Sequence, residues 1–90
     1  MQPTANQLRD LRVAILVNLY RRAPRGRPAE ELCRLINQEV PCGIAEVERQ
    51  LAFLGEMVRS VPVTDLAPGL PPFWMITPQG MAKCEQEHLV

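Results

Sequence analysis

The stretch Phe73–Gly80 constrains the fold more than any other part of this chain. Phe73–Ile76 is an unbroken apolar run of strand length, and Thr77 and Pro78 follow it directly. A threonine hydroxyl can accept a free backbone N–H at a helix start, and proline suits the first helical position. The sequence therefore predicts a strand that leads at once into a closing helix, which we expect to end near His88.

The residues before this run indicate a hairpin. Arg59 to Thr64 alternates as a strand does, and Pro62 limits it to a sheet edge or a bulge. Asp65 to Pro72 is rich in proline and marks a stiff tip. Two antiparallel strands joined across this tip are therefore expected.

The N-terminal part predicts one long helix. Thr4 and Gln7 have the spacing of a capping box, in which each side chain bonds the backbone N–H of the other residue. Apolar residues recur at helical intervals from there to about Arg22. They form two adjacent bands that together cover more than half of the circumference, which is wider than the apolar face of an ordinary surface helix. We therefore expect this helix to be buried on two sides.

Two shorter helices are expected before the hairpin. Proline and glycine break the first pattern, and Pro28 suits the start of a second helix that ends near Glu39. Pro41 cannot continue it, and a third helix is expected from about Ile44 to Val58. The residues expected to face the core are Leu32, Leu35 and Ile36 in the second helix and Val47, Leu51, Leu54 and Val58 in the third.

The composition fits one soluble domain, here expected over residues 4–88. Apolar residues make up 47% of the 90 residues, enough for a single core. No apolar run approaches the roughly 20 residues needed to cross a bilayer, and the N-terminal residues lack the apolar block of a signal peptide. We therefore expect a cytoplasmic protein without membrane contact.

The cysteines argue against both a disulfide framework and a metal site. Cys33, Cys42 and Cys84 are odd in number and form no Cys-x-x-Cys pair, which favours reduced thiols in an intracellular protein. Cys84 and His88 are four residues apart, but two ligands fall short of the three or four that zinc takes. No metal and no other cofactor is expected.

Three stretches, Leu32–Ile36, Val47–Leu54 and Ile76–Gly80, follow one another in the expected order of elements. On these stretches the chain resembles the winged helix-turn-helix superfamily over about residues 6–88. With Ile15–Pro24 in the first helix, it is similar more particularly to the short ArsR-like proteins of Mu-like transposable prophages. The resemblance implies an α+β fold in which a three-helix bundle carries a two-stranded antiparallel wing and a C-terminal helix. It also implies a wing tip at Asp65–Pro72 and a recognition helix that contacts double-stranded DNA through Ala45, Glu46, Arg49 and Gln50.

Arginines near the end of the first helix are the best candidate contacts to a phosphate backbone. Residues 1–42 hold seven arginines against four acidic residues, a formal charge of +3, whereas residues 43–90 carry −3. Four guanidiniums fall within seven residues, at Arg21, Arg22, Arg25 and Arg27. Such a patch can position a duplex or an acidic protein face. The alternative is a set of solvated side chains, paired in part with Glu30 and Glu31.

The sequence of the third helix is compatible with contacts to DNA and with contacts to a protein. Arg49 can read guanine and Glu46 can accept from cytosine in a major groove, or the two can pair with each other within the helix. Three glutamates on this helix, and the lack of Lys or Arg in Asp65–Pro72, suit a protein partner better than DNA. Phe53 and Met57 lie one turn apart and are expected to pack against the second helix or the sheet, the alternative being that they form an apolar edge for a partner.

The second apolar band of the first helix, formed by Val13, Val17 and Tyr20, predicts a homodimer or a docked partner. One packing contact with the core cannot cover so wide an apolar arc, and leaving the rest exposed to water costs about 25 cal/mol per Å². The alternative is that the closing helix, from Pro78 to His88, covers the band within one chain.

Two functional hypotheses follow. The first is a winged-helix DNA-binding protein, a phage-encoded transcriptional regulator, with the arginines on the backbone and the third helix near the groove. The second is a winged-helix protein–protein interaction module, for phage assembly or host-factor binding, that does not bind DNA. Catalysis is not expected and no small-molecule substrate is evident, because the chain has one histidine and no glycine-rich phosphate loop.

Overall fold

A computed structural model describes residues 4–62 and 70–90 of the chain. Helix α1 (Ala5–Arg22) begins at the predicted capping box. Oγ1 of Thr4 accepts from the N–H of Gln7 at 3.2 Å, and Oε1 of Gln7 accepts from the N–H of Thr4 at 2.7 Å. The predicted start and end of the first helix are therefore confirmed.

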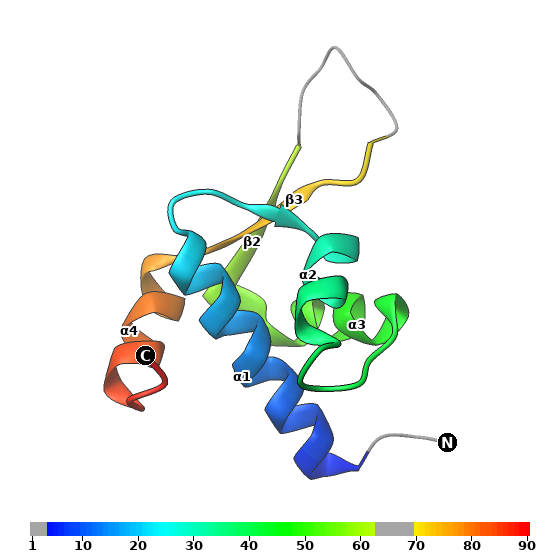
Figure 1. Ribbon diagram of the computed structural model, residues 1–90. Coiled ribbons are helices and arrows are strands. Elements are labelled where there is room, and N and C mark those ends of the chain that lie inside the picture. Colours follow the sequence, from blue (N-terminus) through cyan, green and yellow to red (C-terminus); the bar gives the residue numbers. More distant parts are fainter. Residues whose placement is uncertain (1–3, 63–69) are drawn as a thin grey trace.

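Helices α2 (Ala29–Ile36) and α3 (Ile44–Leu54) pack with α1 as a bundle around the core (Figure 1). All three helices contribute fully buried aliphatic side chains, among them Ile15, Leu19, Leu32, Val47 and Leu51. Removal of this apolar surface from water is the main favourable term in folding. Leu35, which was predicted to face inward, is only half-buried.

Several predicted helix boundaries were wrong. Helix α2 begins after Pro28, because Pro28 belongs to a strand, and it ends at Ile36 rather than near Glu39. Helix α3 ends at Leu54, because Gly55 takes a φ of +58° and opens a short 3-10 turn, η1 (Gly55–Met57). Glycine adopts this positive φ without the steric cost that a Cβ atom would bring. Val58 is buried as predicted, but it starts a strand instead of ending the helix.

The sheet has three strands, not the two that were expected. Strands β2 (Val58–Val61) and β3 (Phe73–Ile76) pair antiparallel, which confirms the predicted hairpin, and Ser60 lies opposite Trp74. Strand β1 (Arg27–Pro28) pairs with the other edge of β3 and gives the order β1-β3-β2. Residues 63–69, which include most of the predicted tip, lie outside the described residues.

Helix α4 (Pro78–Gln86) closes the fold against α1 and η1. Its start was predicted correctly: Oγ1 of Thr77 accepts from the N–H of Gly80 at 3.2 Å and donates to the carbonyl oxygen of Glu56 at 2.5 Å. The hydroxyl therefore caps the helix and ties it to the end of η1.

The end of α4 comes at Gln86, two residues before the predicted position. His88 has a φ of +56°, and the N–H of Leu89 reaches back to the carbonyl oxygen of Cys84 at 2.8 Å. A left-handed residue followed by such a bond is a common helix ending, in which the next apolar side chain folds back. Leu89 accordingly packs against the core.

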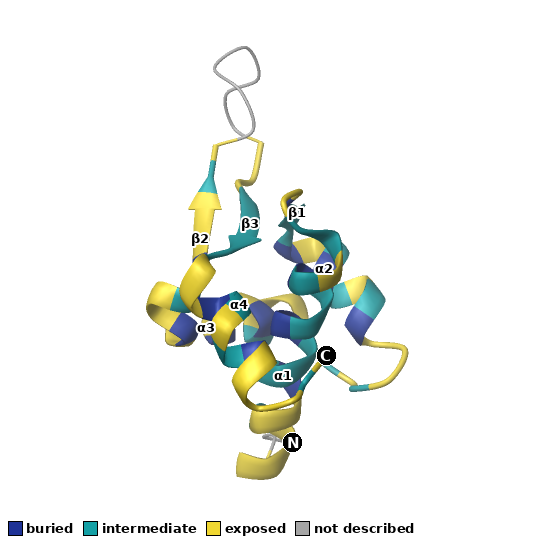
Figure 2. Ribbon diagram, turned by 90° about the vertical axis from the view of Figure 1, so that its left-hand side faces the viewer, coloured by how far each residue is buried: buried dark blue, intermediate teal, exposed yellow. Residues whose placement is uncertain are grey.

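The described residues thus form a small α+β domain of four α-helices and a three-stranded antiparallel sheet (Figure 1). Buried residues concentrate where the helices face one another, whereas the sheet extends away from the bundle (Figure 2). Within residues 4–62 and 70–90, no helix is both long and apolar enough to span a bilayer.

Candidate interaction groove

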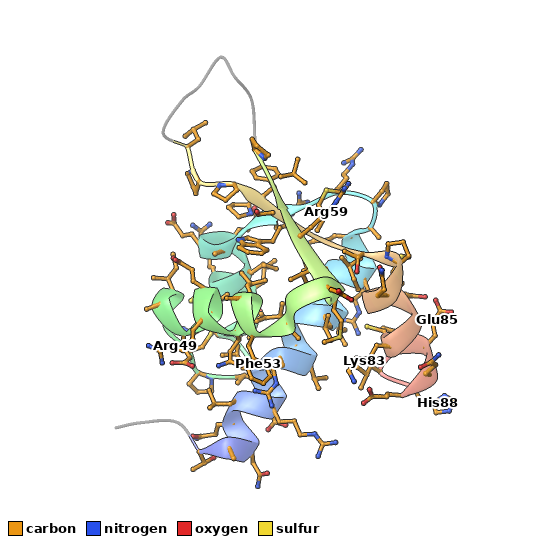
Figure 3. The ribbon with its side chains drawn as sticks, turned by 180° about the vertical axis from the view of Figure 1, so that it is seen from behind. Arg49, Phe53, Arg59, Lys83, Glu85 and His88 are labelled. Carbon is orange, nitrogen blue, oxygen red and sulfur yellow. The ribbon has the colours of Figure 1, made fainter. Side chains whose placement is uncertain are left out.

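Phe53 lies on the solvent side of α3, with 69% of its surface exposed. The prediction that it packs inside the domain was wrong. Leu51 and Leu54 take the inward positions of this turn, and at 100° per residue the side chain between them points away from the core. Met57, its expected neighbour inside the domain, does pack against the core. Figure 3 shows Phe53 on the lower edge of α3, one turn after Arg49.

The guanidinium of Arg12, on α1, lies over the exposed ring of Phe53, 4.8 Å from its centroid. Nη1 of Arg12 also donates to Oε1 of Gln50 at 3.0 Å, and Gln50 is only 4% exposed. Gln50 in turn donates to Glu46 at 3.1 Å. Because a cation is attracted to the negative face of an aromatic ring, these contacts together fix Arg12 beside Phe53.

Phe53 and Arg12 line a groove of about 270 Å³ between α1, α3 and α4. Its apolar lining comes from Val13, Leu16, Leu54, Met57 and Leu89. Its charged lining comes from Arg9, Arg12, Lys83 and Glu87, of which the last two pair with each other. In the described part of the chain, neither Arg9 nor Arg12 has an ion-pair partner, so two positive charges stand beside an apolar floor. Sequence reasoning had not singled out either arginine.

The four predicted recognition positions differ in their surroundings. Ala45 and Arg49 are exposed, Glu46 is half-buried and Gln50 is buried. Nη1 of Arg49 lies 2.9 Å from Oε2 of Glu46, so the alternative of a pair within the helix is present. Gln50 is held by the contacts described above. Glu48 is exposed and adds a further negative charge to α3.

The arginine cluster lies apart from the exposed face of α3. Arg21 and Arg25 are exposed and Arg22 is half-buried, and none of the three has an ion-pair partner among the described residues. Arg27 differs, because its Nε lies 3.2 Å from Oε1 of Glu31. The loop after α1 and the start of α3 lie on opposite sides of the molecule in Figure 1. The two groups of predicted DNA contacts therefore lie apart in the fold.

The second apolar band of α1 is partly covered by the chain itself. Tyr20 packs against the core, and its hydroxyl donates to Oε1 of Glu85 on α4 at 3.3 Å. Burial, and then the Glu85 carboxylate, raise the pKa of Tyr20. Val13 is half-buried in the groove, and Val17 is half-buried in a separate hollow of about 240 Å³ that Val40 also lines. The homodimer through this band stays a prediction.

Comparison with protein-family models, with curated proteins and with solved structures finds no match to this chain. A functional proposal therefore depends on the chemistry of the surfaces described above.

Proposed function

We propose that this chain is a winged-helix-type interaction module that binds an acidic, amphipathic segment of another protein in the groove beside Phe53. The observation that carries the proposal is the exposed Phe53 ring beneath the fixed guanidinium of Arg12. Aromatic and arginine side chains dominate the binding energy of many protein interfaces. The order α1-β1-α2-α3-β2-β3-α4 supports the winged-helix part, since a helix-turn-helix followed by an antiparallel hairpin is the expected pattern.

Charge favours an acidic partner over a second copy of the chain. A twofold interface presents the same patch from both copies, so one centred on the groove would bring Arg9 and Arg12 close to their own symmetry mates. Carboxylates on a different partner would instead neutralise these guanidiniums, and such charge-assisted hydrogen bonds are among the stronger ones. The apolar floor would take the apolar face of the same segment.

The exposed ring is large enough to matter for affinity. A buried aromatic side chain covers about 150–250 Å², and 69% of Phe53 is still exposed. Roughly 100–170 Å² therefore remains to be covered, which corresponds to about 3–4 kcal/mol at 25 cal/mol per Å². Ordering the partner reduces this gain. Removal of the ring is therefore expected to raise the dissociation constant at least tenfold, which corresponds to about 1.4 kcal/mol.

Peptide display against the immobilised chain, followed by NMR titration of the selected peptides, tests the proposal. We expect sequences that combine apolar residues with Asp or Glu, signal shifts around Phe53 and Lys83, and affinity at least tenfold lower for F53A. Ile44 provides a matched control, because it is an exposed apolar residue of α3 that lies outside the groove. Selection of no acidic, apolar peptides would overturn the proposal, as would equal binding by wild type and F53A.

Double-stranded DNA is the second candidate partner, because Arg21, Arg22 and Arg25 carry charge without ionic partners among the described residues. In this alternative the chain is a regulator whose arginines hold the phosphate backbone. Binding to a random duplex is measured at about 50 mM and 200 mM salt. Each phosphate that the protein neutralises adds about −0.9 to the slope of the logarithm of the binding constant against the logarithm of the salt concentration. Neutralising the three arginines should flatten this slope, and no binding at the lower salt would remove the candidate.

A further inference from the structure

Two thiols that are nine residues apart in sequence face each other in the fold. Cys33 lies near the end of α2, and Cys42 lies in the segment that leads into α3. Their Sγ atoms are 3.9 Å apart, and each sulfur also lies within 3.6–3.9 Å of the carbonyl oxygen of the other residue. Both residues are half-buried, unlike Cys84, which is fully buried.

The backbone on either side keeps the thiols together. The N–H of Asn37 donates to the carbonyl oxygen of Cys33 at 2.9 Å, and Oδ1 of Asn37 accepts from the N–H of Cys42 at 2.9 Å. One asparagine therefore ties both cysteines into the turn between α2 and α3. Formation of an S–S bond of about 2.05 Å requires the sulfurs to approach by roughly 2 Å. Cys42 lies outside regular secondary structure, so rotation of its side chain and a small shift of its loop can supply this movement.

We propose that Cys33 and Cys42 are a modification site, which a small-molecule disulfide such as oxidised glutathione converts to an intramolecular disulfide that clamps the turn between α2 and α3. One protein thiolate attacks a sulfur of the reagent, forms a mixed disulfide and releases one reagent thiolate. The second protein thiolate attacks the protein sulfur of that mixed disulfide and releases the other reagent thiolate. Two protein thiols are oxidised to one disulfide, and the reagent is reduced to two thiols that take up the two protons.

The reaction is expected to be slow at neutral pH. Burial, and then the neighbouring Cys33, raise the pKa of Cys42 to about 11. Because the thiolate is the attacking species, the rate of bond formation should rise as the pH is increased. Cys84 is fully buried in the core and provides an internal control, since it should stay reduced while the domain is folded.

The full chain is equilibrated without air in buffers from fully reduced to fully oxidised glutathione, and then alkylated and digested with trypsin. Cleavage after Arg34 separates the two cysteines, so the predicted bond joins peptide 26–34 to peptide 35–49. We expect the intact protein to lose two hydrogens and its Tm to rise by roughly 10 °C, as for the closure of a short loop. C33S and C42S should show no linked peptide and no rise in Tm, whereas C84S should behave as wild type.

Three results would overturn the proposal. The first is that both thiols remain alkylatable in fully oxidised glutathione. The second is a bond that joins Cys84 to either of the other two cysteines. The third is that peptides 26–34 and 35–49 are linked but Tm does not rise, which would show that the bond does not stabilise the turn between α2 and α3. The wild-type measurements decide all three, so the outcome does not depend on whether a serine variant folds.

Discussion

Alanine in place of Gly80 is expected to destabilise the domain, although alanine is the better helix former. Gly80 is buried in the first turn of α4. A methyl group at this position would overlap the carbonyl oxygen of Met57 and lie 2.7 Å from Cγ1 of Ile76. The first obstacle is backbone of η1 and the second is a β-branched side chain of β3, which has little rotational freedom. Neither can move aside without a shift of the main chain.

Two effects of opposite sign decide the result. Replacing glycine with alanine stabilises a helix interior by about 1 kcal/mol, and Gly80 lies in the first turn, where the gain is smaller. Forcing a methyl group into packed surroundings costs about 1–3 kcal/mol. Here α4 packs against α1, η1 and β3 together, so the helix must move by about 1 Å to restore ordinary contact distances. We expect a net loss of about 2 kcal/mol, and a fall in Tm of roughly 10 °C for a chain of this size.

Urea unfolding followed by circular dichroism measures this loss of unfolding free energy. Substitutions at two other glycines distinguish the effect of a steric clash from that of backbone strain. G43A adds a methyl group that meets nothing within 4 Å, so this variant should lose less than about 1 kcal/mol of unfolding free energy. G55A also meets nothing within 4 Å, but its φ of +58° is strained for alanine. The free energy of unfolding should therefore fall by about 1–3 kcal/mol through backbone strain alone. If G80A is as stable as wild type, with an unchanged denaturant slope, α4 does not pack on η1 as closely as described.

Three further predictions concern the helix ending, the thiols and the assembly state. H88G should raise the unfolding free energy by about 1 kcal/mol, because glycine takes the φ of +56° without steric cost. A lower unfolding free energy of H88G in urea would contradict this. The pKa of Cys42 is raised from 9.0 to about 11, so the folded state holds this proton more tightly; its contribution to stability is complete below pH 9 and is lost as the pH rises through 11. Unfolding measured from pH 8 to 11 should show this decline, and it should be smaller for C42S. The homodimer predicted through the second apolar band would use the hollow at Val17, which is separate from the groove. Sedimentation should then give a dimer that V17E dissociates, and a wild-type monomer at high micromolar concentration would refute the dimer.

The elements that the sequence predicted well are those with local signals. Thr4 with Gln7, and Thr77 with Pro78, position their helices because a capping side chain bonds a backbone group only three residues away. The apolar run of β3 is similarly self-contained. The end of α3 also has a local signal in Gly55, because glycine commonly follows the last helical residue. The apolar periodicity continues past it to Val58, however, and so predicts a longer helix.

Strand β1 had no local signal. Arg27 and Pro28 are too few to show alternation, and they pair with Trp74 and Phe73, more than forty residues later in the chain. Only the assembled fold brings these segments together. The same limit applies to the Cys33–Cys42 pair. Its nine-residue spacing is not that of a Cys-x-x-Cys motif, and its proximity depends on the turn through Asn37.

The exposure of Phe53 likewise depends on elements other than α3. Phe53 and Met57 are one helical turn apart, and both are expected inside the domain because exposed aromatic side chains are uncommon on small domains. In the fold α3 ends at Leu54 and α4 packs against η1, so Met57 is partly covered whereas Phe53 is left at the surface. The turn at His88 then folds Leu89 back into the groove wall instead of extending α4. The groove is therefore bounded by the ends of two helices, and a helical segment of a partner would have an open apolar edge on which to continue the packing.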